Sequence, residues 1–126
     1  MSSSTSIQNR QFSRVGTFAD LLVRYIGEWK DGDAPAVYNA ARIDRRTYSS
    51  IVSNPFRAVS KRTAIQFAVA LRLKRSETDR LLLAAGYALS PAILEDAVFA
   101  AFISSGEYDF FKINERLDSL GMKVVL

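Results

Sequence analysis

Apolar residues recur at intervals of three and four positions along most of the chain, which is the spacing that places them on one face of an α-helix. In the first such segment Phe18, Leu22, Tyr25 and Trp29 follow this spacing until Gly32. The same pattern predicts seven helical segments, at residues 17–32, 33–41, 44–53, 60–71, 76–86, 92–104 and 109–121. No segment alternates between apolar and polar residues for long enough to indicate a β-strand. The sequence therefore predicts an all-α fold.

Polar residues stand where most of these helices are expected to begin. A side-chain oxygen at that position can accept a hydrogen bond from a free backbone N–H of the first turn. The residues predicted to do so are Thr17, Asp33, Asp44, Ser60, Ser76 and Asp109. Ser90 followed by Pro91 is also typical of a helix start, because proline is favoured at the first helical position.

The segment from Asp44 to Ser53 differs from the others because its polar face carries two arginines at the helix start. Its apolar face is narrow and consists of Tyr48 and Ile51, with Val52 as a further candidate, and its opposite face carries Arg45, Arg46, Ser49 and Ser50. Positive charge at a helix N-terminus opposes the helix dipole, so these arginines indicate a negatively charged partner. The alternative is a solvated arginine face without a partner.

Composition limits the chemistry that the chain can perform. The 126 residues contain no His and no Cys, which excludes thiol nucleophiles, zinc fingers and His-assisted triads, and no cofactor or metal is expected. The adjacent carboxylates Glu95 and Asp96 point about 100° apart on a helix and cannot easily flank one bond. An enzyme is therefore not expected. The polar residues 1–16 read as a flexible arm without a secretory signal, which indicates a cytoplasmic, nucleoid-associated protein.

Two runs in the chain resemble the Cro and phage-repressor type, or XRE-like, helix-turn-helix family. The first is Ala41–Ile51, similar to that family's turn and recognition helix, and the second is Lys61–Leu71, similar to the helix that follows. The resemblance implies a five-helix repressor-like domain over residues 17–89, with helix 44–53 in the major groove of double-stranded DNA. By this resemblance the base-contacting residues are Arg45, Arg46, Ser49 and Ser50. The expected phosphate-contacting residues are Thr47, Asn54, Arg57, Lys61 and Arg62.

Three positions depart from the family pattern. Arg42 stands where the turn usually has glycine, and it must either accept a positive φ or open the turn. Tyr38 replaces a small inner residue and would push two helices apart unless its ring swings outward. Ala34 replaces a glutamine that touches phosphate in the family.

Charge is strongly polarised along the chain. Between Arg42 and Arg75 nine basic residues face one acid, a net charge of +8, whereas between Glu95 and Asp118 six acids and two basic residues give −4. Basic residues gathered in one region are typical of a DNA-binding surface, because phosphate neutralisation supplies most sequence-independent affinity.

Residues 90–126 are expected to form a two-helix C-terminal extension, which we call the tail. Its apolar residues Phe99, Phe102, Phe110 and Ile113 are expected to form a homodimer contact, although they could also cover the chain's own core. The sequence thus predicts a DNA-binding transcriptional regulator, repressor-like and dimeric, from a bacterium or phage. The alternative is a protein-interaction adaptor that keeps the fold and is associated with a bacterial defence, toxin-antitoxin or mobile-element system, by resemblance to XRE-like domains with similar tails.

Overall fold

The computed structural model describes residues 16–125, and every regular element in that range is a helix. The all-α prediction is thereby confirmed for this part of the chain. The expected N-terminal arm lies outside the described residues except for Gly16. The seven helices are α2 (Phe18–Lys30), α3 (Ala34–Ala40), α4 (Arg45–Ser53), α5 (Lys61–Ala70), α6 (Arg75–Ala84), α7 (Leu94–Ser104) and α8 (Phe110–Ser119).

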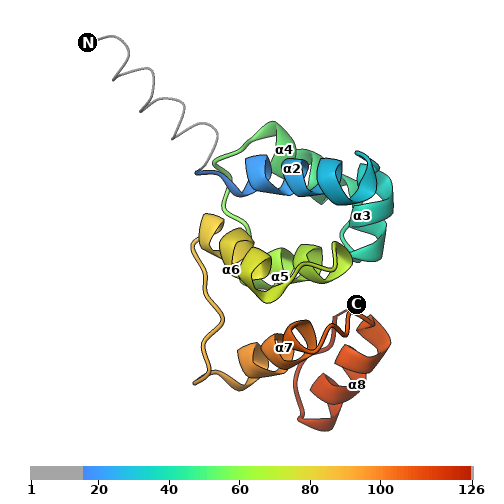
Figure 1. Ribbon diagram of the computed structural model, residues 1–126, viewed down its shortest axis with the longest axis vertical. Coiled ribbons are helices and arrows are strands. Elements are labelled where there is room, and N and C mark those ends of the chain that lie inside the picture. The colour runs from blue at the N-terminus through green and yellow to red at the C-terminus, as the bar shows by residue number, and fades with distance from the viewer. Residues whose placement is uncertain (1–15, 126) are drawn as a thin grey trace, which may run out of the picture.

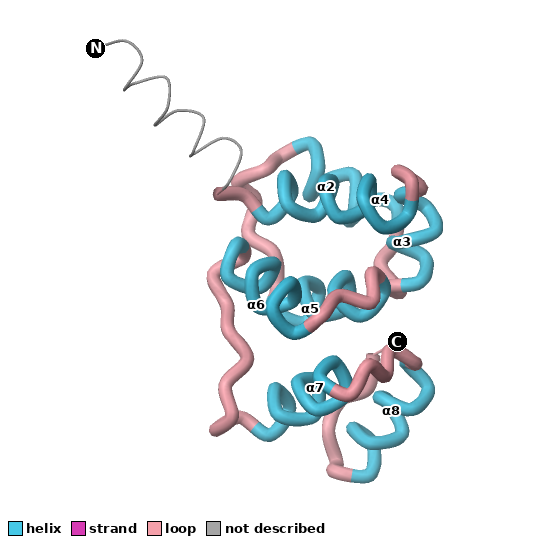
Figure 2. Tube along the Cα trace, in the orientation of Figure 1, coloured by secondary structure: helices cyan, strands magenta, loops and turns pink. Residues whose placement is uncertain are grey.

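The helices are stacked in three groups along the long axis of the molecule (Figure 1). Helices α2 and α4 lie along one side and α3 crosses at one end, while α5 and α6 occupy the middle. The tail helices α7 and α8 lie on the side of α5 and α6 that faces away from α2 and α4. A long loop from α6 to α7 links the tail to the other five helices (Figure 2). The proposed reading helix and the tail are therefore on opposite sides.

Side-chain caps begin most of the helices, as the sequence predicts. The side chains of Thr17, Asp33, Asp44, Ser60 and Asp109 each accept a hydrogen bond from a backbone N–H in the first turn of the helix that follows. These bonds satisfy donors that have no partner within the helix. Local sequence therefore determines where α2, α3, α4, α5 and α8 begin.

The predicted starts of α6 and α7 need correction. Helix α6 begins at Arg75 rather than after Ser76, because Glu77 reaches back and accepts from the N–H of Lys74 at 3.0 Å. Helix α7 begins at Leu94, later than the predicted Ala92, and the Ser90 hydroxyl accepts from the Ala92 N–H within the preceding loop. Ser90 thus stabilises the loop rather than the helix.

The tail shares the hydrophobic core of the other helices. Phe67 of α5, Leu81 of α6, Phe99 of α7 and Ile113 of α8 are all fully buried and belong to one cluster. Burial of this kind contributes roughly 1.5–3 kcal/mol for each large apolar side chain. Trp29, which was expected on the apolar face of its helix, is instead half exposed. The tail is thus part of the folded unit.

This packing corrects the expectation that the apolar side of the tail faces a second chain. Phe99 and Ile113 are 0% exposed and Phe110 is 8% exposed within one chain. Phe102 is partly buried and packs against the same core. Three of the four expected dimer residues are therefore inaccessible to a partner, because they fill the chain's own interior.

The turn between α3 and α4 is closed and places Arg42 at a φ of 61°. The N–H of Arg42 donates to the Asn39 carbonyl at 3.1 Å, and the N–H of Ile43 donates to the Tyr38 carbonyl at 2.9 Å. These are the bonds of a helix end with one left-handed residue. Of the two possibilities for Arg42, an open turn or a positive φ, the structure has the positive φ.

Candidate nucleic-acid interface

Helix α4 presents its arginine face to solvent. Arg45, Arg46 and Ser49 are exposed, and Ser50 and Thr47 are half-buried at the edges of the same face. On the opposite side Ile51 is 2% exposed and anchors the helix to the core. The four residues expected to contact bases therefore lie on one helix, three of them on its open side.

Two aromatic contacts hold α4 from behind. The Tyr48 ring lies 5.2 Å from the Tyr38 ring of α3 and 6.4 Å from the Phe67 ring of α5, measured between centroids. Burial raises the pKa of Tyr48, and the neighbouring Tyr38 adds to that effect. Tyr38 therefore does not force α3 and α4 apart, because it is half-buried and packs against Tyr48.

Asp44 fixes the start of α4. Its Oδ1 accepts from the Thr47 N–H at 2.7 Å, and this hydrogen bond is the main reason that the pKa of Asp44 is lowered. The Thr47 hydroxyl and the charge of Arg46 lower it further. An ionised carboxylate also offsets the unfavourable placement of two arginines in the first turn. Asp44 thus reduces the electrostatic cost of placing Arg45 and Arg46 at this helix end.

The loop that follows α4 carries further exposed residues near its face. Asn54, Phe56 and Arg57 are all exposed, and Phe56 has 80% of its surface accessible. The N–H of Asn54 donates to the Ser50 carbonyl and closes the helix, while the N–H of Arg57 donates to the Asn54 carbonyl at 2.9 Å. The expected phosphate-contacting residues Asn54 and Arg57 therefore sit on a turn that directly continues α4.

Lys61 and Arg62 are placed differently from the expectation, because both contact the tail. Lys61 Nζ lies 2.5 Å from Asp96 Oδ2, and Arg62 forms an ion pair with Glu95. Arg62 also donates to the Lys123 carbonyl at 2.9 Å and lies over the Phe99 ring. Burial lowers the pKa of Arg62. In this structure both residues attach α7 to α5 and are not free to bind phosphate.

Arg42 also anchors the tail, at the start of α8 and at Val125. Its guanidinium donates to the Val125 carbonyl at 3.0 Å and lies 5.3 Å and 5.6 Å from the ring centroids of Phe110 and Phe111. The Tyr108 hydroxyl adds a hydrogen bond to the Leu73 carbonyl at 2.7 Å. Basic residues of the +8 region therefore serve two purposes, because some face solvent beside α4 and others hold the acidic tail.

Two polar residues have structural roles that the sequence did not predict, because Gln66 was not singled out and Asp96 was considered only as a carboxylate beside Glu95. Gln66 is 8% exposed and donates to the Ala41 carbonyl at 2.8 Å, which ties α5 to the turn before α4. Asp96 is 2% exposed and accepts from both Lys61 and the Ser90 N–H. In each helix a polar residue on the apolar face could have indicated such a role, because a buried polar group requires a hydrogen-bond partner.

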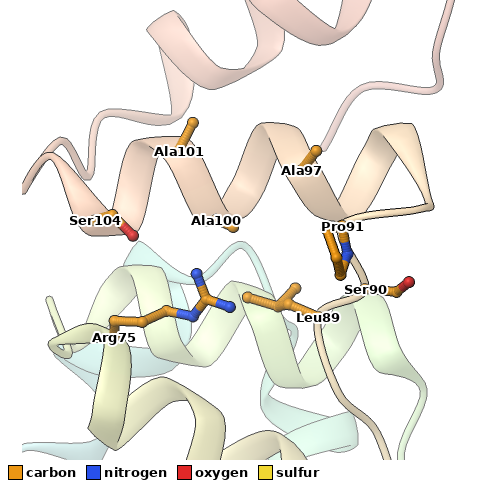
Figure 3. A pocket seen from close by; sticks show the side chains of 8 residues that line it. All are labelled: Arg75, Leu89, Ser90, Pro91, Ala97, Ala100, Ala101 and Ser104. Carbon is orange, nitrogen blue, oxygen red and sulfur yellow. The ribbon is translucent and has the colours of Figure 1, made fainter.

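A cleft of about 380 Å³ lies between α7, the loop that precedes it and the start of α6. Arg75 and Leu89 lie on one side of it and the small residues Ala97, Ala100 and Ala101 of α7 lie on the other (Figure 3). Arg75 is engaged by Asp79 at 3.0 Å, so the cleft does not present a free charge. It shows no convergence of polar groups comparable to the α4 face.

Comparisons of the chain with protein-family models, with curated proteins and with solved structures found no match. Within residues 16–125 no acidic side chains are grouped in a way that could hold a metal ion. None of the helices in that range has the length and apolar character needed to cross a membrane.

Proposed function

We propose that this protein binds double-stranded DNA as a helix-turn-helix transcriptional regulator and reads the major groove with α4. The observation that carries the proposal is the exposed face of α4, where Arg45, Arg46 and Ser49 project from a helix that is capped by Asp44 and held from behind by the core. Arginine is the side chain that most often reads guanine in the major groove, through a bidentate contact. The closed turn between α3 and α4 supports the same arrangement.

The charge around α4 also favours a nucleic acid. The sequence contains no acidic residue from Arg45 to Ser76. Lys61 and Arg62 are neutralised by the tail, so the phosphate contacts fall to Arg57, Asn54 and Thr47 beside the reading face. Such contacts position the protein, whereas Arg45, Arg46, Ser49 and Ser50 provide the sequence preference.

The test is a selection of bound duplexes from a random library, followed by substitution of the reading residues. Arg45→Ala or Arg46→Ala should cost about 1–3 kcal/mol on the selected site and relax the preference at one base pair. Arg116→Ala on α8 is the matched control, because it removes an exposed arginine from the tail. If the reading variants and the control behave alike, α4 does not read DNA.

The second candidate is a protein-interaction adaptor that keeps this fold. The engagement of Lys61 and Arg62 by tail carboxylates favours it, because that engagement removes two of the expected phosphate contacts. An adaptor would show no enrichment of any duplex sequence in the same selection.

A further inference from the structure

A cavity of about 590 Å³ opens where three connections between helices meet, and we call it the turn cavity. The turn from α3 to α4 contributes Asn39 and Arg42, the turn from α5 to α6 contributes Arg72, and the loop from α7 to α8 contributes residues 107–111. Helices α3 and α8 lie at the same edge of the molecule (Figure 1). Sites for small molecules typically have volumes of roughly 300–1,000 Å³, so the turn cavity has the size of such a site.

Arg72 lies in this cavity and has a backbone conformation that favours glycine. Its φ is 54°, its N–H donates to the Val69 carbonyl at 3.0 Å, and the Leu73 N–H donates to the Ala68 carbonyl at 3.1 Å. Glycine would end the helix with the same bonds and without the steric penalty. The exposed Arg72 guanidinium has no ion pair or hydrogen-bond acceptor among residues 16–125. Residues with such unrelieved strain cluster at ligand sites, which directs attention to what Arg72 faces.

Arg42 is the second cation of the turn cavity, and its φ of 61° is also left-handed. Its Nη1 donates to the Val125 carbonyl at 3.0 Å, which uses one of the five N–H donors of a guanidinium. The same guanidinium lies 5.6 Å from the ring centroid of Phe111, which lines the cavity and is 77% exposed. The turn cavity therefore joins two arginine side chains to an aromatic ring that is open to solvent.

The two carboxylates that line the turn cavity already have partners in the tail. Glu107 Oε1 accepts from Lys112 Nζ at 2.8 Å, and Asp109 Oδ1 accepts from the Phe111 N–H at 2.9 Å. With Lys112 counted beside the two arginines, three cations and two carboxylates leave a net charge of +1. The remaining charge and the unused guanidinium donors favour an anion, because charge-assisted hydrogen bonds are the stronger ones.

We infer that the turn cavity binds a small organic anion with an aromatic ring, whose carboxylate or phosphate oxygens accept hydrogen bonds from Arg72 and Arg42 and whose ring lies against Phe111. Arginine suits this role because its planar fork can bind two oxygens of a carboxylate or a phosphate at once. A ring on Phe111 adds the stacking contact that two aromatic groups make. The inference goes beyond the proposed function and does not rest on it.

Phenyl phosphate and phenylacetate are the probes, and NMR spectra of the isotope-labelled full chain report their binding. Each probe should shift the backbone amide signals of residues 39–42 and 107–111 and of Arg72 in a saturable way, and the tighter probe identifies the anionic group. Benzyl alcohol lacks the anion and inorganic phosphate lacks the ring. Both should bind more weakly than the tighter aromatic anion, by about threefold or more.

Arg72→Gly removes the guanidinium and relieves the left-handed backbone, so this variant should keep its fold. It should bind the tighter probe about tenfold more weakly, because a hydrogen bond to a charged group is lost. Phe111→Ala should weaken binding of the aromatic anions by about threefold and leave that of inorganic phosphate unchanged. Arg24→Ala is the matched control, because Arg24 is an exposed arginine of α2 outside the turn cavity, and it should bind like the natural protein.

The inference is overturned if neither aromatic anion gives saturable shifts at these residues, or if Arg72→Gly binds the probes like Arg24→Ala. Benzyl alcohol that binds as tightly as phenylacetate would reject the role of the arginines. Inorganic phosphate that binds as tightly as phenyl phosphate, or Phe111→Ala that binds like the natural protein, would reject the role of the ring. The titration contains no DNA, so its failure and that of the proposed function are distinguishable.

Discussion

At the scale of single residues, Arg42 combines a costly backbone conformation with favourable side-chain contacts. Its φ of 61° costs a non-glycine residue roughly 1–2 kcal/mol, while its guanidinium contacts Val125, Phe110 and Phe111. Both Arg42→Ala and Arg42→Gly remove the contacts, but only glycine relieves the backbone. Thermal unfolding should therefore find the glycine variant about 1 kcal/mol more stable than the alanine variant. Equal stability of the two would mean that the turn is not left-handed in solution.

Asp44 gives the stability of α4 a dependence on pH. Its hydrogen bond from Thr47 holds its pKa below the ordinary value of 3.8. A lowered carboxyl pKa contributes stability above the unfolded pKa, and that contribution is lost as the pH falls through the folded pKa. Asp44→Ser keeps a cap that does not titrate. The unfolding temperature of the natural protein, relative to that of Asp44→Ser, should fall as the solution is acidified below pH 3.8. A difference that stays constant with pH would contradict this role.

At the scale of elements, α5 and α7 are joined by two neighbouring ion pairs of different burial. Asp96 has a side-chain exposure of 3% and also accepts from the Ser90 N–H, whereas Glu95 has an exposure of 39%. Asp96→Ala leaves two donors without their acceptor and should cost more than about 2 kcal/mol. Glu95→Gln should cost less than about 1 kcal/mol, because Glu95 is the exposed partner and Arg62 keeps its hydrogen bond to the Lys123 carbonyl. Chemical denaturation measures both, and similar losses would show that the two pairs are equivalent.

The sequence predicts where helices begin better than it predicts the contacts between them. Helix starts at Thr17, Asp44 and Ser60 were predictable because a cap acts within three residues of itself. The pairing of Lys61 with Asp96 was not predictable, since these residues are 35 positions apart and only tertiary packing brings them together. The start of α6 was misplaced because both Ser76 and Glu77 offer cap signals, and the glutamate made the bond.

The candidate site was likewise predictable from the sequence only in part. The exposed face with Arg45, Arg46 and Ser49 followed from helical periodicity and the single buried anchor Ile51. The roles of Lys61 and Arg62 depend on which anionic groups lie next to them in the folded chain. Helical periodicity does not show which groups these are. A basic residue at a helix start can bind phosphate or an acidic helix equally well, because both supply anionic oxygens.

At the scale of the whole molecule, the tail behaves as part of the core. Phe99, Ile113 and Leu117 are fully buried, so deletion of residues 90–126 would expose the surface that they cover. It would also leave Lys61 and Arg62 without their carboxylates. The truncated chain should therefore lose its cooperative thermal transition, as followed by circular dichroism. A transition near that of the full chain would mean that the first five helices fold alone.

Self-association remains a prediction, and it can no longer rest on Phe99, Phe110 and Ile113. Phe102 is the member of the expected set that stays partly exposed. A symmetric pair of chains would place two α4 helices about one DNA turn apart, roughly 34 Å, and would select a pseudo-palindromic site. Light scattering with and without the selected duplex measures the number of chains in the complex.

The proposed function depends on contact between the phosphates of duplex DNA and the exposed face of α4 with the loop that follows it. The most direct test is the affinity for duplex DNA measured over a range of salt concentrations. We predict a linear fall of log affinity with log salt, with a slope of about −0.9 for each neutralised phosphate, and a slope shallower by about 0.9 in Arg57→Ala. Binding that does not change with salt, or no binding to duplex DNA at low salt, would contradict the proposed function.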